Sequence, residues 1–181
     1  MMKRTLVIYK SKYGATQAYA RMISEALGCD RIMVDQMKLF SQFGEYENIV
    51  LCLPIYNGLL AGINTVKARY YRISEKNITL FMVGLTDLAS EAEIDRTVIA
   101  SLTEGMQHKF RIFYAKGRMT YRSLMPLDKM AWNKWIKYLR KKPEQKLNET
   151  EMEMLNHSRD KLDYIDEASI QSLIKYIRSL S

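Results

Sequence analysis

The fold of this chain is decided by the stretch Thr5-Leu6-Val7-Ile8-Tyr9-Lys10-Ser11-Lys12-Tyr13-Gly14-Ala15-Thr16. Its first five residues form a short, continuous run of mostly apolar residues, which is typical of a parallel strand buried on both faces. From Thr16 to Leu27 apolar residues recur at helical spacing, and Gly28 stands where a helix C-cap is expected. The stretch therefore predicts a strand, a tight loop and a helix, which is the first half of a β-α-β unit.

The rest of the chain repeats this alternation of short apolar runs and helical patterns. Further strands are predicted at 31–34, 48–53, 78–83 and 110–114, and further helices at 64–73, 91–102 and from Asp166 onward. Five strands with intervening helices indicate a doubly wound α/β fold, for which we expect a parallel sheet of order 2-1-3-4-5. The 181 residues, 48% of them hydrophobic, fit a single domain spanning 1–181.

The loop 11–16 carries the first functional hypothesis. In a doubly wound sheet, ligands bind outside the carboxyl ends of the strands at the point where the strand order reverses, and this loop lies there. A phosphate would meet the unpaired N–H groups and the positive dipole end of the following helix. The candidate phosphate-binding residues are Ser11, Lys12, Tyr13, Gly14, Ala15 and Thr16. The alternative is a plain strand-to-helix turn, and neither G-x-G-x-x-G nor G-x-x-x-x-G-K-[ST] occurs.

Two later loops are expected at the same edge of the sheet, after the third and fourth strands. They are Pro54-Ile55-Tyr56-Asn57-Gly58 and Gly84-Leu85-Thr86-Asp87. An isoalloxazine ring needs a flat aromatic wall, which Tyr56 can supply, and backbone hydrogen bonds to its polar edge, which Gly58 and the later loop can supply. Together the three loops predict an FMN site. We expect no metal site, and no side chain is singled out as a catalytic acid, base or nucleophile.

The loop 11–16 resembles the flavodoxin signature S/T-x-T-G-x-T, with Tyr13 in place of the central threonine. That change removes one hydroxyl, so backbone amides are expected to carry more of the phosphate binding. Residues 45–51 and 54–58 look like the third-strand region of flavodoxin-domain proteins. Residues 115–130 and 162–166 are similar to the bacterial menaquinone-dependent protoporphyrinogen oxidases, short proteins with a basic insertion before the last helix. The resemblance implies a flavodoxin-like fold, bound FMN and oxidoreductase activity, with quinone-linked protoporphyrinogen oxidation as the finer expectation.

A basic insertion is predicted between the fifth strand and the last helix, over about 116–162, because a plain loop of that length is rare. Residues 109–146 hold twelve Lys and Arg against two acids, a formal charge of +10 in a chain whose total is +8. Within the insertion, Pro126 is well placed to begin a helix that runs to about Lys142. Its expected apolar face consists of Leu127, Met130, Ala131, Trp135, Tyr138 and Leu139, with Trp132 flanking it.

This helix, 126–142, indicates peripheral contact with a membrane surface or another anionic partner, unless its apolar face packs on the domain. Nucleic acid is the least favoured partner, because basic charge alone gives no sequence-specific contact. Lys116, Arg118 and Arg122 are expected near the flavin edge, where they could bind carboxylates of a porphyrin-like substrate. A simple flavodoxin-type electron carrier and a flavin-free binding module stay open as alternatives.

Two further observations concern the location of the protein in the cell and the alternative that it is a phosphorylation-receiver domain. No signal peptide or membrane-spanning stretch is recognised, and Cys29 and Cys52 lie apart without a C-x-x-C motif, so we expect a cytoplasmic protein with reduced thiols. A phosphorylation-receiver domain shares the topology but needs paired acids after the first strand and an Asp ending the third. This chain has Ser11-Lys12 and Leu53-Pro54 at those places.

Overall fold

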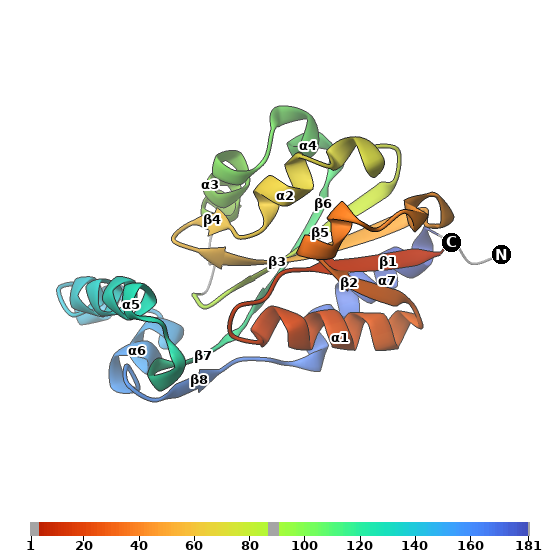
Figure 1. Cartoon of the computed structure of the whole chain (residues 1–181). Helices are drawn as coiled ribbons and strands as arrows, with labels where there is room; N and C mark the ends of the chain where they lie inside the picture. Colours follow the sequence, from red (N-terminus) through yellow and green to blue (C-terminus); the bar gives the residue numbers. More distant parts are fainter. Residues whose placement is uncertain (1–3, 87–90, 181) are drawn as a thin grey trace.

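The main sheet has the predicted topology in the computed structural model, which describes residues 4–86 and 91–180 (Figure 1). Its parallel strands lie in the order β2-β1-β3-β5-β6. They are β1 (Thr5–Tyr9), β2 (Asp30–Met33), β3 (Asn48–Tyr56), β5 (Asn77–Gly84) and β6 (Arg111–Lys116). All five predicted strands and the order 2-1-3-4-5 are confirmed. The strand order reverses between β1 and β3, so the loops that follow these strands meet at one edge.

Helices cover both faces of this sheet (Figure 1). One face carries α1 (Ala15–Leu27) and α7 (Gln171–Ser179), and the other carries α2 (Ile63–Lys67), α3 (Glu91–Ser101) and α4 (Glu104–Lys109). The prediction of a helix over 64–73 is wrong in length, because the backbone leaves the helical region at Arg69, with φ −124° and ψ 13°. The short strand β4 (Leu59–Leu60), which pairs with β3, and the helix α4 were not predicted.

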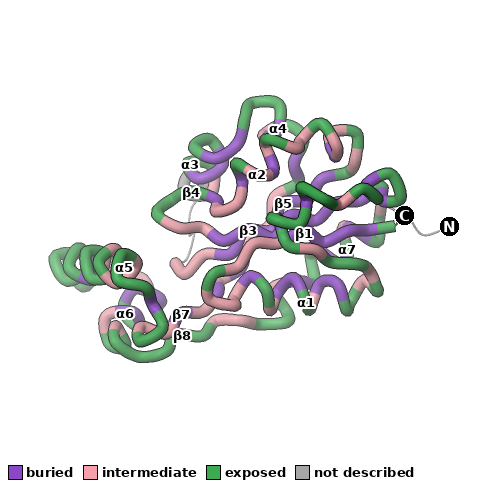
Figure 2. Tube along the Cα trace, viewed as in Figure 1, coloured by how far each residue is buried: buried purple, intermediate pink, exposed green. Residues whose placement is uncertain are grey.

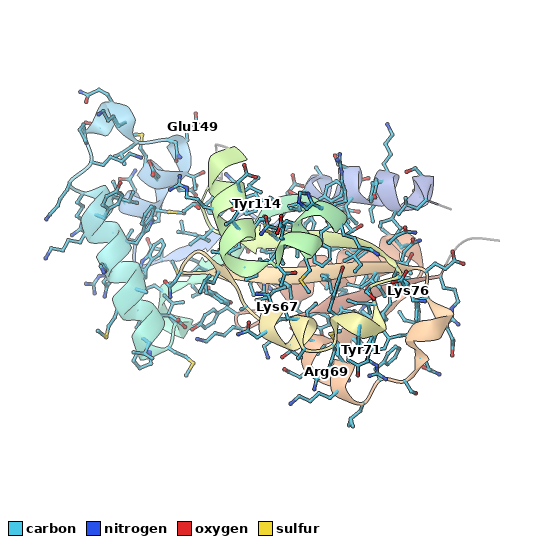
Figure 3. The ribbon with its side chains drawn as sticks, turned by 90° about the horizontal axis from the view of Figure 1, so that it is seen from above. Lys67, Arg69, Tyr71, Lys76, Tyr114 and Glu149 are labelled. Atoms are coloured by element: carbon cyan, nitrogen blue, oxygen red, sulfur yellow. The ribbon has the colours of Figure 1, made fainter. Side chains whose placement is uncertain are left out.

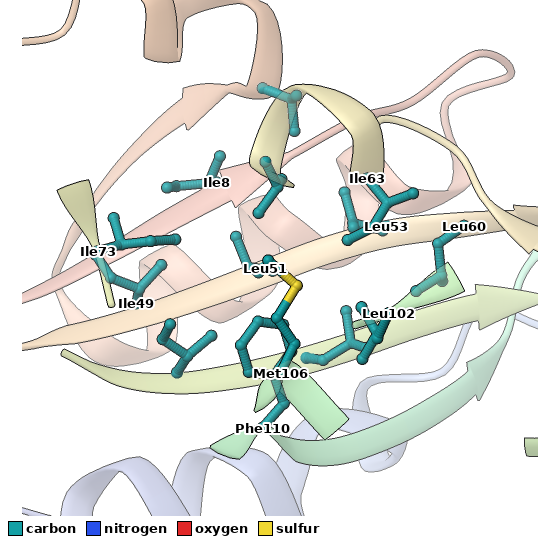
Figure 4. Close-up of a cluster of buried hydrophobic side chains, with 14 of the residues drawn as sticks. Ile8, Ile49, Leu51, Leu53, Leu60, Ile63, Ile73, Leu102, Met106 and Phe110 are labelled. Carbon is teal, nitrogen blue, oxygen red and sulfur yellow. The ribbon is translucent and has the colours of Figure 1, made fainter. Parts of the chain in front are cut away.

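Alternate side chains of the central strands enter two separate cores. Ile8 and Leu51 point to the face covered by α2, α3 and α4, where they join the cluster shown in Figure 4. Val7, Val50 and Phe81 point to the opposite face, against α1 and α7. All five residues are fully buried. In Figure 2 the central strands are accordingly coloured largely purple. Burial on both faces explains why the strands read as continuous apolar runs rather than as alternating ones.

The predicted insertion is a helical unit on a two-stranded stem. β7 (Arg118–Thr120) pairs antiparallel with β8 (Lys161–Asp163), and between them lie α5 (Pro126–Leu139) and α6 (Glu149–Asn156). In Figure 1 these two helices project from one end of the sheet, and Figure 3 shows Glu149 of α6 far from Lys76 at the other end. The unit has a small core of its own, composed of Met119, Leu124, Trp132, Ile136, Leu139, Met154 and Leu162. Tyr13 and Leu85 of the main domain pack against that core.

The insertion begins and ends at one point of the main domain. The Gly117 N–H donates to the Gly84 carbonyl at 2.6 Å, and the Gly117 carbonyl accepts from the Tyr164 N–H at 3.0 Å. A Cβ on Gly117 would lie 2.9 Å from Cγ1 of Val83 and 3.1 Å from Cβ of Ala15, so a side chain there would force these elements apart. Gly117 therefore allows the strand, the stem and the start of α1 to meet closely.

The apolar face predicted for α5 is wrong in part, because Leu139 of this face is buried but three of its other residues are exposed. The buried residues of this helix are Trp132, Ile136 and Leu139. Three residues of the predicted face are 78, 68 and 57% exposed, namely Leu127, Met130 and Tyr138. The helix also ends at Leu139 rather than near Lys142.

The side of α5 that faces inward is set by its neighbours in the insertion. The Trp132 indole N–H donates to the Ser158 carbonyl at 2.7 Å, which turns this side of the helix toward α6 and the stem. The exposed apolar residues are left on the opposite, outer side. Within the described residues, no helix is long and apolar enough to cross a membrane.

Candidate functional site

A cavity of about 750 Å³ lies at the carboxyl ends of β1, β3 and β5, between the main sheet and the insertion. This volume is within the range of roughly 300–1,000 Å³ that is common for small-molecule sites. From the predicted loops it is lined by Ser11, Tyr13, Ala15, Thr16, Pro54, Ile55, Tyr56, Asn57, Gly58, Gly84, Leu85 and Thr86. Asp87 lies outside the described residues. The structure thus brings the three predicted loops together around one space.

The loop 11–16 presents unpaired donors to this cavity. Gly14 is the N-cap of α1 with φ +85°, and its N–H donates to Oγ of Ser11 at 3.1 Å. The N–H groups of Ala15, Thr16 and Gln17 in the first turn of α1 have no acceptor within the described chain. Such a turn is suited to an anion, because the amides and the helix dipole both favour negative charge.

Tyr13 connects this loop to the insertion. Its hydroxyl donates to Oδ2 of Asp128 in the first turn of α5 and accepts from the Met125 N–H at 3.1 Å. Met125 is the N-cap of α5 and provides no side-chain cap, so the Tyr13 hydroxyl takes up one of the N–H groups at this helix end.

Lys12 binds the same carboxylate, with its Nζ 2.5 Å from Oδ2 of Asp128. Hydrogen bonds from Lys12 first, and then from Tyr13, lower the pKa of Asp128, while the hydrogen bond to Asp128 raises the pKa of Lys12. Both groups are therefore charged at neutral pH, and the side chain of Lys12 is engaged with the insertion.

Aromatic side chains form two walls of the cavity. Tyr56 stands on the sheet side, with its ring centroid 6.4 Å from that of Tyr13 in an edge-on arrangement. Burial raises the pKa of Tyr56 to about 12, so it is a neutral phenol at physiological pH. Trp132 and Trp135 of α5 lie on the insertion side. The Trp135 indole N–H is buried and has no acceptor among the described residues.

The loop after β3 is a tight hairpin that returns into β4. Asn57 and Gly58 have φ of +51° and +75°, which is the pattern of a two-residue turn that matches the strand twist. The loop after β5 is held by Tyr114, whose hydroxyl donates to the Thr86 carbonyl. Tyr114 lies in the middle of the view in Figure 3. Both loops are therefore fixed by backbone geometry or by a hydrogen bond.

The three cations predicted near the flavin edge lie in different places. Arg118 lines the cavity. Lys116 points into the insertion, where its Nζ donates to Oγ1 of Thr150 at 2.9 Å and lies 4.8 Å from the centroid of the Tyr164 ring. Arg122 is exposed on the stem side of the insertion and is not among the cavity-lining residues. Of these three described residues, Arg118 is the one placed to touch a bound molecule.

Sequence reasoning missed part of the lining. These residues come from the end of β5, from α3, from β6 and from the insertion: Val83, Arg96, Thr97, Ala100, Tyr114, Gly117, Met119, Leu124, Asp128, Ala131, Trp132 and Trp135. Asp128 could have been found, because it is one of two acids in the strongly basic segment and stands in the first turn of the predicted helix. The α3 residues carry no such signal.

The comparison that decides the family is a sequence match. The family model of the flavodoxin domain matches residues 6–146. The chain belongs to the flavodoxin domain family. The matched part of this flavodoxin domain includes all three loops of the cavity and α5, whereas α6, β8 and α7 lie beyond it. No curated protein matches the sequence.

Solved structures of flavoproteins resemble this flavodoxin domain at low identity. A provisionally named flavoprotein from Bacteroides eggerthii is 13% identical, with 74% of this chain and 97% of that one covered and a TM-score of 0.47. A flavoprotein in complex with FMN from Lactobacillus acidophilus is 13% identical, and the alignment covers 63% of this chain and 92% of that one with a TM-score of 0.43. Flavodoxin 1 from Bacillus cereus is 15% identical, with 63 and 84% covered and a TM-score of 0.41. Likenesses at this level do not bear on cofactor or activity.

Proposed function

We propose that this flavodoxin-domain protein binds FMN in the cavity and works as an electron-transferring oxidoreductase. The observation that carries the proposal is the juxtaposition, in one cavity, of a helix N-terminus with unpaired amides and aromatic side chains from both the sheet and the insertion. The amides of Ala15, Thr16 and Gln17 fit a phosphate, and the walls at Tyr56 and Trp135 fit a flat ring. When bound, FMN supplies the redox chemistry, and the protein supplies binding, orientation and a partly covered ring edge.

The buried indole N–H of Trp135, which has no acceptor among the described residues, supports the binding of FMN in this cavity. A buried N–H without an acceptor costs free energy, so its presence beside the cavity favours a ligand with acceptor atoms. The carbonyl oxygens and ring nitrogens of an isoalloxazine are such acceptors. The family membership of residues 6–146 is consistent with the same cofactor.

FMN binding is tested by titrating the purified protein with FMN and recording flavin absorbance and fluorescence. We expect bound flavin, and we expect Gly14→Ala to weaken binding about tenfold, since a side chain at φ +85° strains the loop by roughly 1–2 kcal/mol. Gly105→Ala in α4 is the matched control, because a Cβ there meets no atom within 4 Å. A wild-type protein that ignores added FMN would contradict the proposal.

A more specific reaction is favoured by the second wall of the cavity. An electron carrier needs only one exposed flavin edge, whereas here the insertion adds a wall with Trp132 and Trp135 to a space of about 750 Å³. We propose oxidation of protoporphyrinogen with a quinone acceptor, by a cytoplasmic protein that contacts the membrane surface. The FMN-loaded protein should then form fluorescent porphyrin from protoporphyrinogen only when a menaquinone analogue is added. Flavin reduction by a reductase without porphyrin formation would instead assign the simple carrier function.

A further inference from the structure

We infer that Arg118 binds the phosphate of FMN and replaces the hydroxyl that Tyr13 removes from the flavodoxin signature. This inference rests on the proposed FMN site and identifies a residue of that site outside the loop 11–16. Three independent observations support it: the position of the guanidinium, the charges around it, and the role that Tyr13 has taken in this chain.

The guanidinium of Arg118 lies against the phosphate loop. A Cβ built on Gly14 would be 3.4 Å from Nη2 of Arg118, so this nitrogen is in contact range of the N-cap of α1. Arg118 also lines the cavity, as do Ala15 and Thr16 of the first turn of α1. Its backbone is fixed, because it follows Gly117, which is hydrogen-bonded to both Gly84 and Tyr164. The side chain therefore leaves from a well-anchored point.

The charges around the loop leave Arg118 available. The other cation at the loop, Lys12, is paired with Asp128 at 2.5 Å. The acid nearest to Arg118 along the stem is Asp163, its partner in the β7–β8 pairing, and that carboxylate is 2.8 Å from Nζ of Lys161. Within the described chain, the guanidinium of Arg118 makes no hydrogen bond and no close ion pair. Its charge acts on Asp163 at longer range: burial raises the pKa of Asp163, but the hydrogen bond from Lys161 and the charges of Lys161 and Arg118 outweigh burial and lower it. An arginine that is partly buried beside a helix N-terminus, without a hydrogen-bonded carboxylate partner, favours an anion.

The substitution at position 13 explains why such a cation is useful. The Tyr13 hydroxyl donates to Asp128 and accepts from Met125, so it is engaged with the insertion. Ser11 Oγ already accepts from the Gly14 N–H. A guanidinium presents several donors in one plane and matches the oxygens of a phosphate better than an ammonium does. Arg118 can thus supply both the missing donor and the charge.

The test compares two ligands and two matched variants by fluorescence titration. Arg118→Gln should weaken FMN binding by about ten- to a hundredfold, which is the range of a lost charge-assisted hydrogen bond. Riboflavin, which lacks the phosphate, should bind Arg118→Gln as well as it binds the wild type. Arg122→Gln removes the same charge four residues away on an exposed side chain and should leave both affinities unchanged.

The outcomes separate this inference from the proposed function. If wild-type protein binds neither flavin, the FMN site itself is wrong. If wild-type protein binds FMN and Arg118→Gln binds it equally well, or loses FMN and riboflavin to the same extent, Arg118 does not recognise the phosphate. An Arg118→Lys variant with intermediate FMN affinity would support the inference, because it keeps the charge and loses the planar geometry.

Discussion

Tyr13 stands at the position of a signature threonine, and its hydroxyl contacts the insertion. Together with Lys12 it holds Asp128, so two neighbouring loop residues bind one carboxylate in the first turn of α5. The pKa of Asp128 lies below its ordinary value of 3.8, because Lys12 and then Tyr13 hydrogen-bond the carboxylate. The ionised form therefore stabilises the folded state fully above pH 3.8, and this contribution is lost as the pH falls through the lower folded-state pKa.

The Asp128 contact can be followed by tryptophan fluorescence, since both tryptophans of the chain, Trp132 and Trp135, belong to α5. On acidification below pH 3.8, we expect their emission to shift as the contact weakens. Asp128→Asn should show this shifted emission already at neutral pH and should lower the stability by roughly 1 kcal/mol. Far-UV circular dichroism recorded in parallel separates local release of the insertion from global unfolding.

The control for this experiment is Glu153→Gln, which neutralises an exposed acid on α6. It should keep the wild-type pH profile. If the tryptophan emission of Asp128→Asn and of wild-type protein changes identically with pH, the ionised carboxylate of Asp128 does not stabilise the contact between the loop and the insertion.

For single residues, the sequence predicted which loops line the cavity but not which partners their side chains contact. The loop residues follow directly from the strand order, because parallel strands end at one edge. The contact of Tyr13 with Asp128 joins residues 115 positions apart, and no local pattern records it. Arg118 and Lys116 were indistinguishable in sequence, yet one lines the cavity and the other points to Thr150.

Helix α5 divides its apolar residues between two sides. Its inner side holds the core of the insertion, whereas Leu127, Met130 and Tyr138 stand exposed on the outer side. Three exposed lysines, Lys134, Lys137 and Lys141, belong to the same outer region. Apolar side chains among cations on a projecting helix suit a membrane surface with anionic lipids, to which each cation adds about 1 kcal/mol.

We expect the protein to sediment with vesicles that contain phosphatidylglycerol and to bind pure phosphatidylcholine vesicles much more weakly. Added salt should reduce the binding. The double variant Leu127→Glu, Met130→Glu should bind at least about tenfold more weakly, because two apolar side chains no longer enter the interface.

Leu39→Glu is the matched control for the vesicle experiment. Leu39 is 92% exposed but follows the short helical turn after β2 in the main domain, so its replacement should leave vesicle binding unchanged. A wild-type protein that stays in the supernatant with both kinds of vesicle would show that the outer side of α5 does not bind lipid.

The long strands were predictable because burial on both faces demands an uninterrupted apolar run, as in β3 and β5. The strands β4, β7 and β8 have two or three residues each, too few to establish a period. The inward side of α5 was also beyond the sequence, because apolar residues surround more than half of this helix. Its partners, α6 and the stem, decide which of them are buried.

The molecule as a whole consists of a main domain, in which helices cover both faces of one sheet, and an insertion with its own hydrophobic cluster. The ends of the insertion are adjacent, since Arg118 pairs with Asp163 across the stem. We therefore expect that residues 119–162 can be replaced by Asn-Gly, a two-residue hairpin turn, without loss of the main fold. The shortened protein should unfold cooperatively, with a Tm within about 10 °C of the parent. The reason is that few main-domain side chains besides Tyr13 and Leu85 become exposed to solvent when the insertion is removed.

The same shortened protein should bind FMN more weakly than the full chain, since the wall at Trp132 and Trp135 is gone. Circular dichroism and calorimetry check the fold, and flavin titration checks the site. A shortened chain that is unfolded or aggregated would mean that the insertion is an integral part of the folding unit rather than an addition to it.

The uneven distribution of charge along the chain gives the molecule an electric dipole moment. The segment 109–146 has a formal charge of +10, and the remainder is slightly acidic, so the positive pole lies at the end where α5 borders the cavity. An acidic partner approaching by diffusion experiences a torque before any contact is made, and this torque turns the cavity toward it. Productive collisions then become a larger share of all collisions, and their rate is governed by ionic strength as much as by the shape of the two surfaces.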